Sequence, residues 1–402
     1  MAMDKIEELL TRGVEKIYPS KEELEKVLRS GKKLKLYQGF DPTGIQLHIG
    51  HMVGLKKLRQ WQDLGHHVIF LIGDGTGQAG DPSGKKHTRE KFLTQEELRK
   101  NAVDYIKQAG KIVRFDGNNP VEVLFNGDWL NDLKLIDILN IAGNFSLQQL
   151  SERDLFQERI KNKESVNFRE FLYPLLQGYD SVAMEVDLEV GGSDQTFNML
   201  CGRTLLKSMK NKDKFVMTTP LLTDSKGVKI GKTEGNAIAL TDKPEDLFGK
   251  IMSLPDDVIV KAFEYLTDVS MDQIKNMEEK LIKKENPVAF KKKLAFEIVK
   301  ELNNEQEAQK AQENFKQTVQ GEKLPDDIPI FQHNGEDKQN IINLLVQTKL
   351  AESRSDAKRL IEQGGVSIND NIINNPNTPY IPNERDILRV GKRKFVKIRI
   401  GE

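Results

Sequence analysis

Short apolar runs alternate with helical stretches over the first 240 of the 402 residues, and this alternation restricts the fold more than any other feature of the sequence. Strand-length runs separated by helical spacing are typical of a parallel β-sheet covered by helices. We therefore predict an α/β fold for this part of the chain. The expected strands are 35–39, 68–73, 112–115, 186–190 and 215–218, and the clearest expected helices are 51–63 and 195–207.

The rest of the chain differs in composition from this first part. From Pro244 to about residue 319 it is rich in Lys and Glu and poor in strand formers, which predicts several helices. Two Pro and two Gly among charged residues then indicate a linker. After it, Ser353 is placed to cap a helix that ends at Gly364. The predicted parts are 1–242, 243–320, a linker at 321–338, and 339–402.

Composition excludes several classes of protein. The 61 Lys and Arg balance 61 Asp and Glu, which argues against a uniformly basic nucleic-acid binder, although the last part from Gln339 carries a net charge of +4. The single Cys201 forms no internal disulfide and provides no structural zinc cluster. The longest apolar run, 67–72, is far shorter than the roughly 20 residues that span a bilayer. We expect a cytoplasmic protein with no membrane segment, no resident metal and no prosthetic group.

The segment from Tyr37 to His51 combines a strand, a Gly/Pro turn and a helix start. A helix that begins directly after the first strand of an α/β sheet presents unpaired N–H groups, which suit a phosphate. His48 and His51 are three residues apart on one helix face, and Gly50 leaves the backbone accessible between them. Taken alone, such a pair is more often a surface or packing feature than a catalytic one.

A second segment, 224–236, places Lys229 and Lys232 among three glycines. In isolation it reads as a solvated loop, although two ammonium groups can also bind a polyphosphate. The two segments in this order, His-Ile-Gly-His and then Lys-x-x-Lys-Thr, resemble the HIGH and KMSKS signatures of class I aminoacyl-tRNA synthetases. That resemblance implies a doubly wound, Rossmann-like catalytic domain that uses ATP with Mg²⁺.

A third stretch, 171–180, together with Gly191-Gly192-Ser193-Asp194-Gln195, resembles the amino-acid pocket of tyrosyl-tRNA synthetases. Thr196-Phe197 after Gln195, in place of Trp-Gly, is similar to the second bacterial branch of that family. The resemblance implies that Tyr37 and Asp180 hold the phenol of L-tyrosine. It also implies that Asp81, Tyr173 and Gln177 hold the α-ammonium group, and that Gln195 faces the carboxylate.

The same resemblance implies the ATP site. Donors to the phosphates would be Thr43, His48, Lys85, Arg89, Lys229 and Lys232, with Thr233 beside them and His51 nearer the ribose. Further ATP contacts would come from Gly39, Asp41, Gly50, Gly192 and Asp194. Amino-acid activation needs no enzyme nucleophile, because a substrate carboxylate attacks the α-phosphate, so positioning and electrostatics suffice.

The end of the chain resembles the small α+β S4 RNA-binding module of bacterial members, which follows an all-helical anticodon-binding domain. Arg354, Lys358 and Arg359 would face tRNA(Tyr). The family resemblance also implies a homodimer, and residues 120–165 are a plausible segment for that contact. Three alternatives remain open at this point: a tryptophan-specific relative, a nucleotidyltransferase with a related His-x-Gly-His site, and an inactive RNA-binding paralogue.

Overall fold

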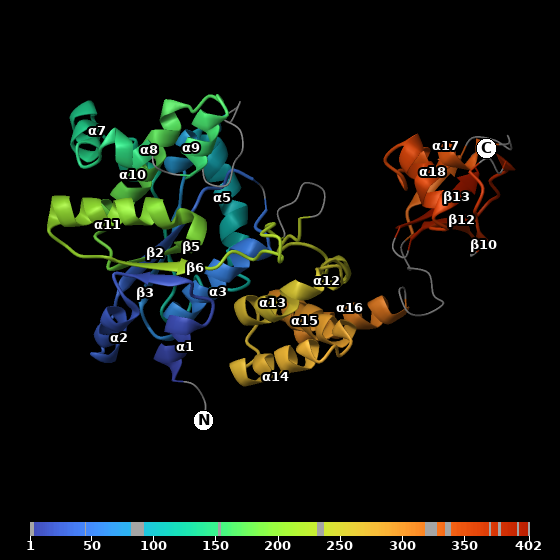
Figure 1. The fold of residues 1–402 in the computed structure, drawn as a ribbon, viewed down its shortest axis with the longest axis horizontal. Coiled ribbons are helices and arrows are strands. Elements are labelled where there is room, and N and C mark those ends of the chain that lie inside the picture. Colours follow the sequence, from blue (N-terminus) through green and yellow to red (C-terminus); the bar gives the residue numbers. More distant parts are fainter. Residues whose placement is uncertain are drawn as a thin grey trace. The chain divides into compact units, whose positions relative to one another are not determined.

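The computed structural model describes residues 4–44, 46–81, 92–151, 154–230, 237–317, 328–333, 339–369, 371–376, 379–391 and 394–400. The chain forms two compact units, Met1–Ala308 and Gln309–Glu402. Figure 1 shows the first in blue to orange and the second in orange to red. Each unit is described by itself below.

A six-stranded sheet forms the centre of the first unit, in the order β1-β6-β5-β2-β3-β4. Only β1 runs antiparallel to its neighbour, and the other pairs are parallel. Buried residues fill five of the six positions of β3, as expected for a strand covered on both faces. The strands are β1 Lys16–Tyr18, β2 Lys35–Phe40, β3 His67–Ile72, β4 Glu122–Phe125, β5 Leu188–Gly192 and β6 Phe215–Thr219.

The parallel α/β fold predicted from the sequence is confirmed, but the strand expected at 112–115 is wrong. The N–H groups of Ile112 and Val113 both bond to the carbonyl of Ala109, so the segment turns at the end of a helix. Its buried apolar side chains pack there and do not pair with β3. The strand beside β3 is β4 instead, with Ile69 opposite Glu122.

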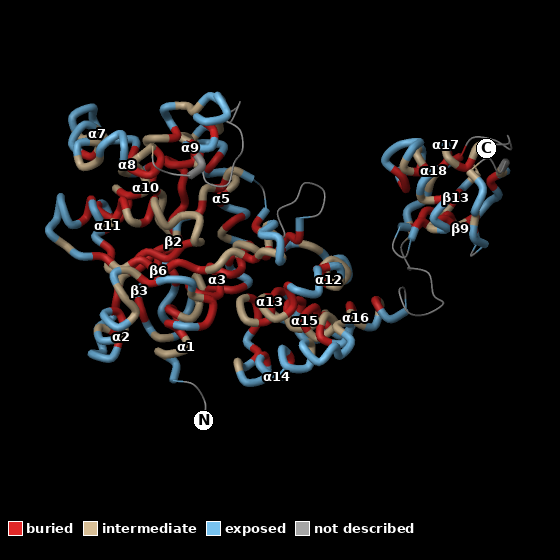
Figure 2. Tube along the Cα trace, viewed as in Figure 1, coloured by how far each residue is buried: buried red, intermediate tan, exposed pale blue. Residues whose placement is uncertain are grey.

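Helices cover both faces of this sheet (Figure 1). α10 and α11 lie on one side, and α1, α2 and α3 lie on the other. Figure 2 shows the buried residues concentrated in the sheet and on the inner faces of these helices. The helices are α1 Lys5–Thr11, α2 Lys21–Arg29, α3 Ile49–Asp63, α4 Thr76–Ala79, α5 Gln95–Ala109, α6 Gly127–Leu130, α7 Leu135–Ala142, α8 Leu147–Ser151, α9 Asp154–Lys161, α10 Phe168–Met184 and α11 Thr196–Lys210.

The chain order around β2 fixes where a ligand can bind. β2 is followed by β3 and β4 on one side of the sheet, whereas β5 and β6 lie on the other. Open parallel sheets bind ligands outside the carboxyl ends of the strands where the order reverses. In this sheet that point lies between β2 and β5.

The helical part that follows the sheet contains α12 Pro244–Met252, α13 Ile259–Leu266, α14 Met271–Ile282, α15 Pro287–Leu302 and α16 Glu305–Phe315. Pro244 stands in the first turn of α12, as expected for a residue without an N–H donor. Lys56 connects α3 to this helical part, because its ammonium nitrogen lies 2.7 Å from Asp268 and 3.0 Å from Glu301. No helix of the described residues is long and apolar enough to cross a membrane.

The second unit has a five-stranded sheet in the order β10-β9-β12-β13-β7, packed against two helices. β7 lies inside the stretch expected to be a linker, and it pairs parallel with β13. The hydroxyl of Ser353 accepts a hydrogen bond from the Asp356 N–H, which is the cap expected from the sequence. The elements are β7 Ile330–His333, β8 Gln339–Asn340, α17 Ile341–Gln347, α18 Arg354–Glu362, β9 Val366–Ile368, β10 Asn371–Ile372, β11 Pro379–Tyr380, β12 Ile387–Val390 and β13 Lys394–Ile400.

Candidate active site

The turn after β2 leads directly into α3, and two histidines cap that helix reciprocally. Nδ1 of His48 accepts a hydrogen bond from the Gly50 N–H, and Nδ1 of His51 accepts one from the His48 N–H, both at 3.1 Å. A ring that accepts at Nδ1 carries its proton on Nε2 when neutral, so Nε2 is the donor atom of each ring. A Cβ at position 50 would lie 2.9 Å from the His48 ring, so a larger residue here would displace that ring.

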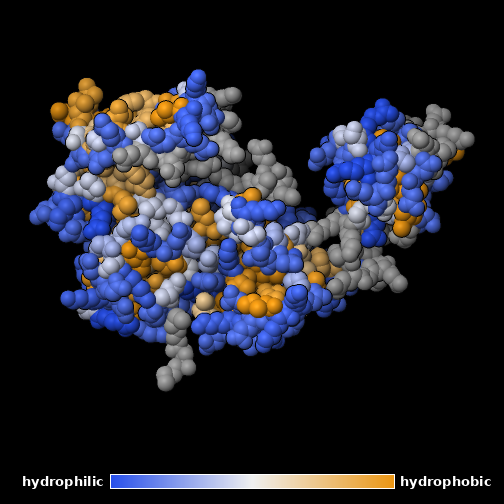
Figure 3. Space-filling model, viewed as in Figure 1, coloured by the Kyte–Doolittle hydropathy of each residue, from blue (hydrophilic) through white to orange (hydrophobic). Residues whose placement is uncertain are grey.

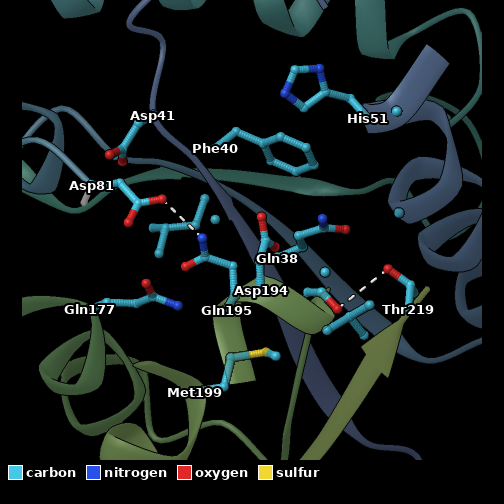
Figure 4. Close-up of a pocket in the computed structure, with 18 of the residues that line it drawn as sticks. Gln38, Phe40, Asp41, His51, Asp81, Gln177, Asp194, Gln195, Met199 and Thr219 are labelled. Carbon is cyan, nitrogen blue, oxygen red and sulfur yellow. Dashed lines mark hydrogen bonds between the residues drawn. The ribbon is translucent and has the colours of Figure 1, made fainter. Parts of the chain in front are cut away.

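A cavity of about 290 Å³ lies at the carboxyl ends of β2 and β5 (Figure 4). It contains every site residue of the first unit that the sequence predicted and the structure describes. They are Tyr37, Gly39, Asp41, Thr43, His48, Gly50, His51, Asp81, Tyr173, Gln177, Asp180, Gly192, Asp194, Gln195 and Lys229. Lys85, Arg89, Lys232 and Thr233 lie outside the described residues.

One end of the cavity holds a buried tyrosine and a buried aspartate. The hydroxyl of Tyr37 lies 3.1 Å from the hydroxyl of Ser181. The Asp180 carboxylate accepts hydrogen bonds from Trp129 Nε1 at 2.8 Å and from Asn126 Nδ2 at 3.0 Å. Burial holds the pKa of Asp180 well above its usual range, and the two hydrogen bonds oppose that rise. Burial also raises the pKa of Tyr37, so its hydroxyl keeps its proton.

The middle of the cavity is lined by amides and carboxylates that are held by one another. Gln195 Nε2 donates to Asp81 at 2.9 Å (Figure 4). Gln177 Nε2 donates to Glu189 at 3.0 Å. The side-chain nitrogen of buried Asn198 donates to both glutamine oxygens, at 3.1 and 2.8 Å. Because Asn198 donates to the oxygen of each glutamine amide, the NH2 group of each amide points to the carboxylate.

Tyr173 and Asp41 complete the wall next to Asp81. The Tyr173 hydroxyl donates to one oxygen of Asp41 at 2.9 Å, and the Thr76 hydroxyl donates to the other at 2.7 Å. Burial raises the pKa of Tyr173 well above its usual value, and nearby Asp41 and Asp81 add to the rise. This wall is therefore rich in negative charge and suits a cation such as a substrate ammonium group.

The second lysine-containing segment reaches the helix that His48 caps. Ile230 bonds to the backbone of Leu222, and its carbonyl lies 3.9 Å from the position of a Cβ built on Gly50. Lys229 Nζ lies 2.8 Å from Asp194 and forms an ion pair with it. Two segments that are about 180 residues apart in the sequence thus contribute to one cavity, as expected from their pairing.

Several residues of the cavity and its support were not found from the sequence. Asn126, Trp129 and Ser181 support the buried tyrosine and aspartate, and Glu189 and Lys214 form a buried ion pair behind them. Their contacts join segments far apart in the chain and follow no local spacing. Asn198 is the exception, since it stands three residues after Gln195, on the same face of the helix start.

Three comparisons with known proteins agree on the family. The family model "tRNA synthetases class I (W and Y)" matches residues 29–320, and the model "Tyrosine--tRNA ligase SYY-like C-terminal domain" matches residues 320–398. A tyrosine–tRNA ligase of Thermotoga maritima is 41% identical over 396 residues, covering 98% of this chain and 97% of the relative. The chain belongs to the tyrosine–tRNA ligase family.

Other relatives extend this result. Tyrosine–tRNA ligase 2 of Pseudoalteromonas translucida is 42% identical over 98% of both chains. A C-terminally truncated mitochondrial tyrosyl-tRNA synthetase of Coccidioides posadasii superimposes with a TM-score of 0.63 at 26% identity, covering 77% of this chain and 91% of that one. The fold is also shared with the tyrosyl-tRNA synthetase of Archaeoglobus fulgidus, at a TM-score of 0.61 and 22% identity over 77% of this chain and 100% of that one. The C-terminal family model and these relatives favour the tyrosine branch over the tryptophan-specific alternative.

Proposed function

We propose that the cavity binds L-tyrosine and ATP next to each other, and that the chain joins them to tyrosyl-adenylate before it transfers the tyrosine to tRNA(Tyr). The observation that carries this proposal is the chemical difference between the parts of one cavity. A buried end offers Tyr37 and Asp180, the middle offers carboxylates and amides, and the far end offers His48 and Lys229 as donors.

In the proposed complex each group of tyrosine meets a partner of matching chemistry. The phenol lies between Tyr37 and Asp180, which supply a donor and an acceptor. The α-ammonium group lies against Asp81, Tyr173 and Gln177, where the wall is negatively charged. The side-chain nitrogen of Gln195 faces the substrate carboxylate. This pose points the carboxylate toward the far end of the cavity.

ATP occupies the far end, with its phosphates at the start of α3. Thr43 and the Nε2 atoms of the two histidines donate to phosphate oxygens or the ribose, whereas the N–H groups of that first turn are already bonded within the protein. Gly39, Gly50 and Gly192 leave space for the nucleotide, and Asp194 accepts from the ribose after Lys229 moves to the phosphates. Lys85, Arg89, Lys232 and Thr233 complete the set of donors.

The chemical step needs alignment and charge stabilisation only. A tyrosine carboxylate oxygen attacks the α-phosphorus, a new P–O bond forms, and the bond to pyrophosphate breaks. His48 and Lys229 stabilise the charge that develops on the leaving group. Mg²⁺ enters with ATP as part of that substrate, and no prosthetic group takes part. The described residues include no group of three or more His, Cys, Asp or Glu side chains arranged to hold a metal ion.

Two sets of variants test this division of the cavity. Tyr37→Phe and Gln177→Ala are expected to weaken equilibrium binding of radiolabelled tyrosine. His48→Ala and Lys229→Ala are expected to leave tyrosine affinity nearly unchanged and to slow adenylate formation. Each is expected to cost about 2 to 4 kcal/mol of transition-state stabilisation, the range for one lost oxyanion donor. If His48→Ala lowered tyrosine affinity and left the rate intact, the division would be wrong.

The second unit is proposed to bind tRNA through α18. Arg354, Lys358 and Arg359 are all exposed on this helix, where they can follow a phosphate backbone. Arg359 also contacts Asp356, and Lys358 lies near Glu362, so phosphates would replace these acidic neighbours. We assign the helical part, 243–320, to the anticodon stem on the family resemblance.

A homodimer is proposed through an apolar surface formed by α7, α8 and the start of α10. Leu135 is 72% exposed, Leu147 is 65% exposed and Phe168 is 69% exposed. Figure 3 shows apolar side chains gathered over this region. A contiguous exposed apolar surface of this kind marks a protein interface, and a second copy is the partner that the family resemblance suggests. The protein is proposed to reside in the cytoplasm, where buried Cys201, which forms no disulfide, stays a thiol.

A further inference from the structure

A buried lysine lies behind the phenol end of the cavity. Lys214, which directly precedes β6, forms an ion pair with Glu189 of β5, and their side chains are 0% and 2% exposed. The Lys214 ammonium group also donates to the hydroxyl of Ser181 on α10, at 2.7 Å. A Cβ at Gly202 of α11 would lie 2.6 Å from the Lys214 nitrogen and 2.7 Å from the Ser181 oxygen. Glycine at this position therefore leaves room for both groups.

The protons of Lys214, Ser181 and Tyr37 limit which hydrogen bonds this group can form. An ammonium group only donates, and a hydroxyl has a single proton. The Ser181 oxygen accepts from Lys214 and keeps its own proton, which it can donate to the Tyr37 oxygen 3.1 Å away. When Tyr37 accepts from Ser181 in this way, its own proton remains for a different acceptor.

We propose that Ser181 and Lys214 are positioning residues that make the Tyr37 hydroxyl a donor to the phenol oxygen of bound tyrosine. This proposal rests on the tyrosine site proposed above. Asp180 then accepts a hydrogen bond from the same phenol. Its carboxylate also accepts hydrogen bonds from Asn126 and Trp129. A substrate without the hydroxyl leaves Tyr37 and Asp180 both unpaired, and that loss disfavours it. Selectivity for tyrosine over phenylalanine thus depends on a lysine that does not touch the substrate.

The ion pair also reaches the middle of the cavity. Glu189 accepts from Lys214 with one oxygen and from Gln177 with the other, at 3.0 Å for the second. Removing Lys214 alone would leave a buried carboxylate without its cation and would disturb both ends of the tyrosine site. The test therefore starts at Ser181, where a variant can leave the ion pair intact.

Ser181→Thr and Ser181→Val have the same shape and differ only in the hydroxyl. The measurement is the ratio of kcat/KM for tyrosine to kcat/KM for phenylalanine in pyrophosphate exchange. We expect Ser181→Thr to keep the wild-type ratio and Ser181→Val to lower it by about tenfold, the upper range for one neutral hydrogen bond. The values for phenylalanine are expected to agree between the two variants, so a general packing defect does not produce this result. Equal ratios in the two variants would overturn the proposal.

A second variant tests the part played by Lys214. The double variant Lys214→Met with Glu189→Met replaces the ion pair by apolar side chains and removes the donor to Ser181. We expect its tyrosine-to-phenylalanine ratio to fall as in Ser181→Val, and an unchanged ratio would exclude Lys214 from selectivity. Tyr37→Phe distinguishes failure of the tyrosine site from failure of the positioning role. If Tyr37→Phe keeps the wild-type tyrosine-to-phenylalanine ratio, the proposed tyrosine site is wrong. If Tyr37→Phe lowers the ratio while Ser181→Thr and Ser181→Val give equal ratios, only the positioning role is wrong.

Discussion

Replacing Trp129 by Phe removes one of the two protein hydrogen bonds to the Asp180 carboxylate while keeping an aromatic ring in place. The bond from Trp129 Nε1 is 2.8 Å long, and the remaining bond from Asn126 is 3.0 Å long. A hydrogen bond to a charged group contributes about 1.5 to 3 kcal/mol. If the variant loses this free energy in the complex in which the phenol donates to Asp180, kcat/KM for tyrosine falls by about tenfold to about a hundredfold.

The pH dependence of this variant has a definite sign. Burial raises the pKa of Asp180, and the hydrogen bonds from Asn126 and Trp129 lower it, so losing Trp129 raises that pKa further. A protonated Asp180 no longer accepts from the phenol with that oxygen. As the pH falls, kcat/KM for tyrosine is therefore expected to decline from a higher pH in Trp129→Phe than in the wild type.

The assay is pyrophosphate exchange with tyrosine over the neutral and weakly acidic range, repeated with phenylalanine. Trp61→Phe is the matched control, because Trp61 is the other tryptophan and its buried Nε1 atom has no hydrogen-bond partner among the described residues. We expect the control to keep the wild-type pH profile even where its stability is lower. A Trp129→Phe profile that coincides with the wild type, or that moves to lower pH, would refute the role given to Asp180.

Three further outcomes follow from the same geometry. Ending the chain after Gln317 removes the whole C-terminal sheet including β7. Adenylate formation is expected to persist. The rate of tRNA charging is expected to fall and to depend less steeply on salt than in the full chain. Leu139→Glu on α7, where Leu139 is 56% exposed, is expected to halve the mass measured by light scattering, and Val103→Glu on α5, 66% exposed, should not change it. Lys214→Met is expected to lower the free energy of unfolding in urea by about 3 to 5 kcal/mol, and adding Glu189→Met should restore most of it, so an unaffected single variant would contradict the buried pair.

The sequence was sufficient for four of the six strands of the sheet and for the residues that carry motifs. β2, β3, β5 and β6 match expected strands because buried parallel strands are continuous apolar runs. The expected strand at 112–115 shows the limit of that signal, since Ile112 and Val113 are buried equally well in a turn. Short apolar runs report burial, and the partner that the backbone finds is decided by distant segments.

The candidate site divides in the same way. His48 and Lys229 could be expected together because each belongs to a local pattern, and the structure brings both to one cavity. Ser181 and Lys214 belong to no pattern, because a serine in a helix and a lysine before a strand are ordinary surface residues in sequence. Their contact appears only in the fold, which brings them within hydrogen-bond distance. Groups that support a site through long-range contacts are therefore the part that sequence reasoning misses.

Amino-acid-dependent exchange of labelled pyrophosphate into ATP, measured without tRNA for all the standard amino acids, addresses the substrate directly. The first half-reaction needs only the cavity of the first unit, because every proposed tyrosine contact lies on it. We expect strong exchange with tyrosine and only background exchange with phenylalanine and tryptophan. Exchange that requires tryptophan, or that responds equally to tyrosine and phenylalanine, would contradict the assignment of Tyr37 and Asp180 to the phenol.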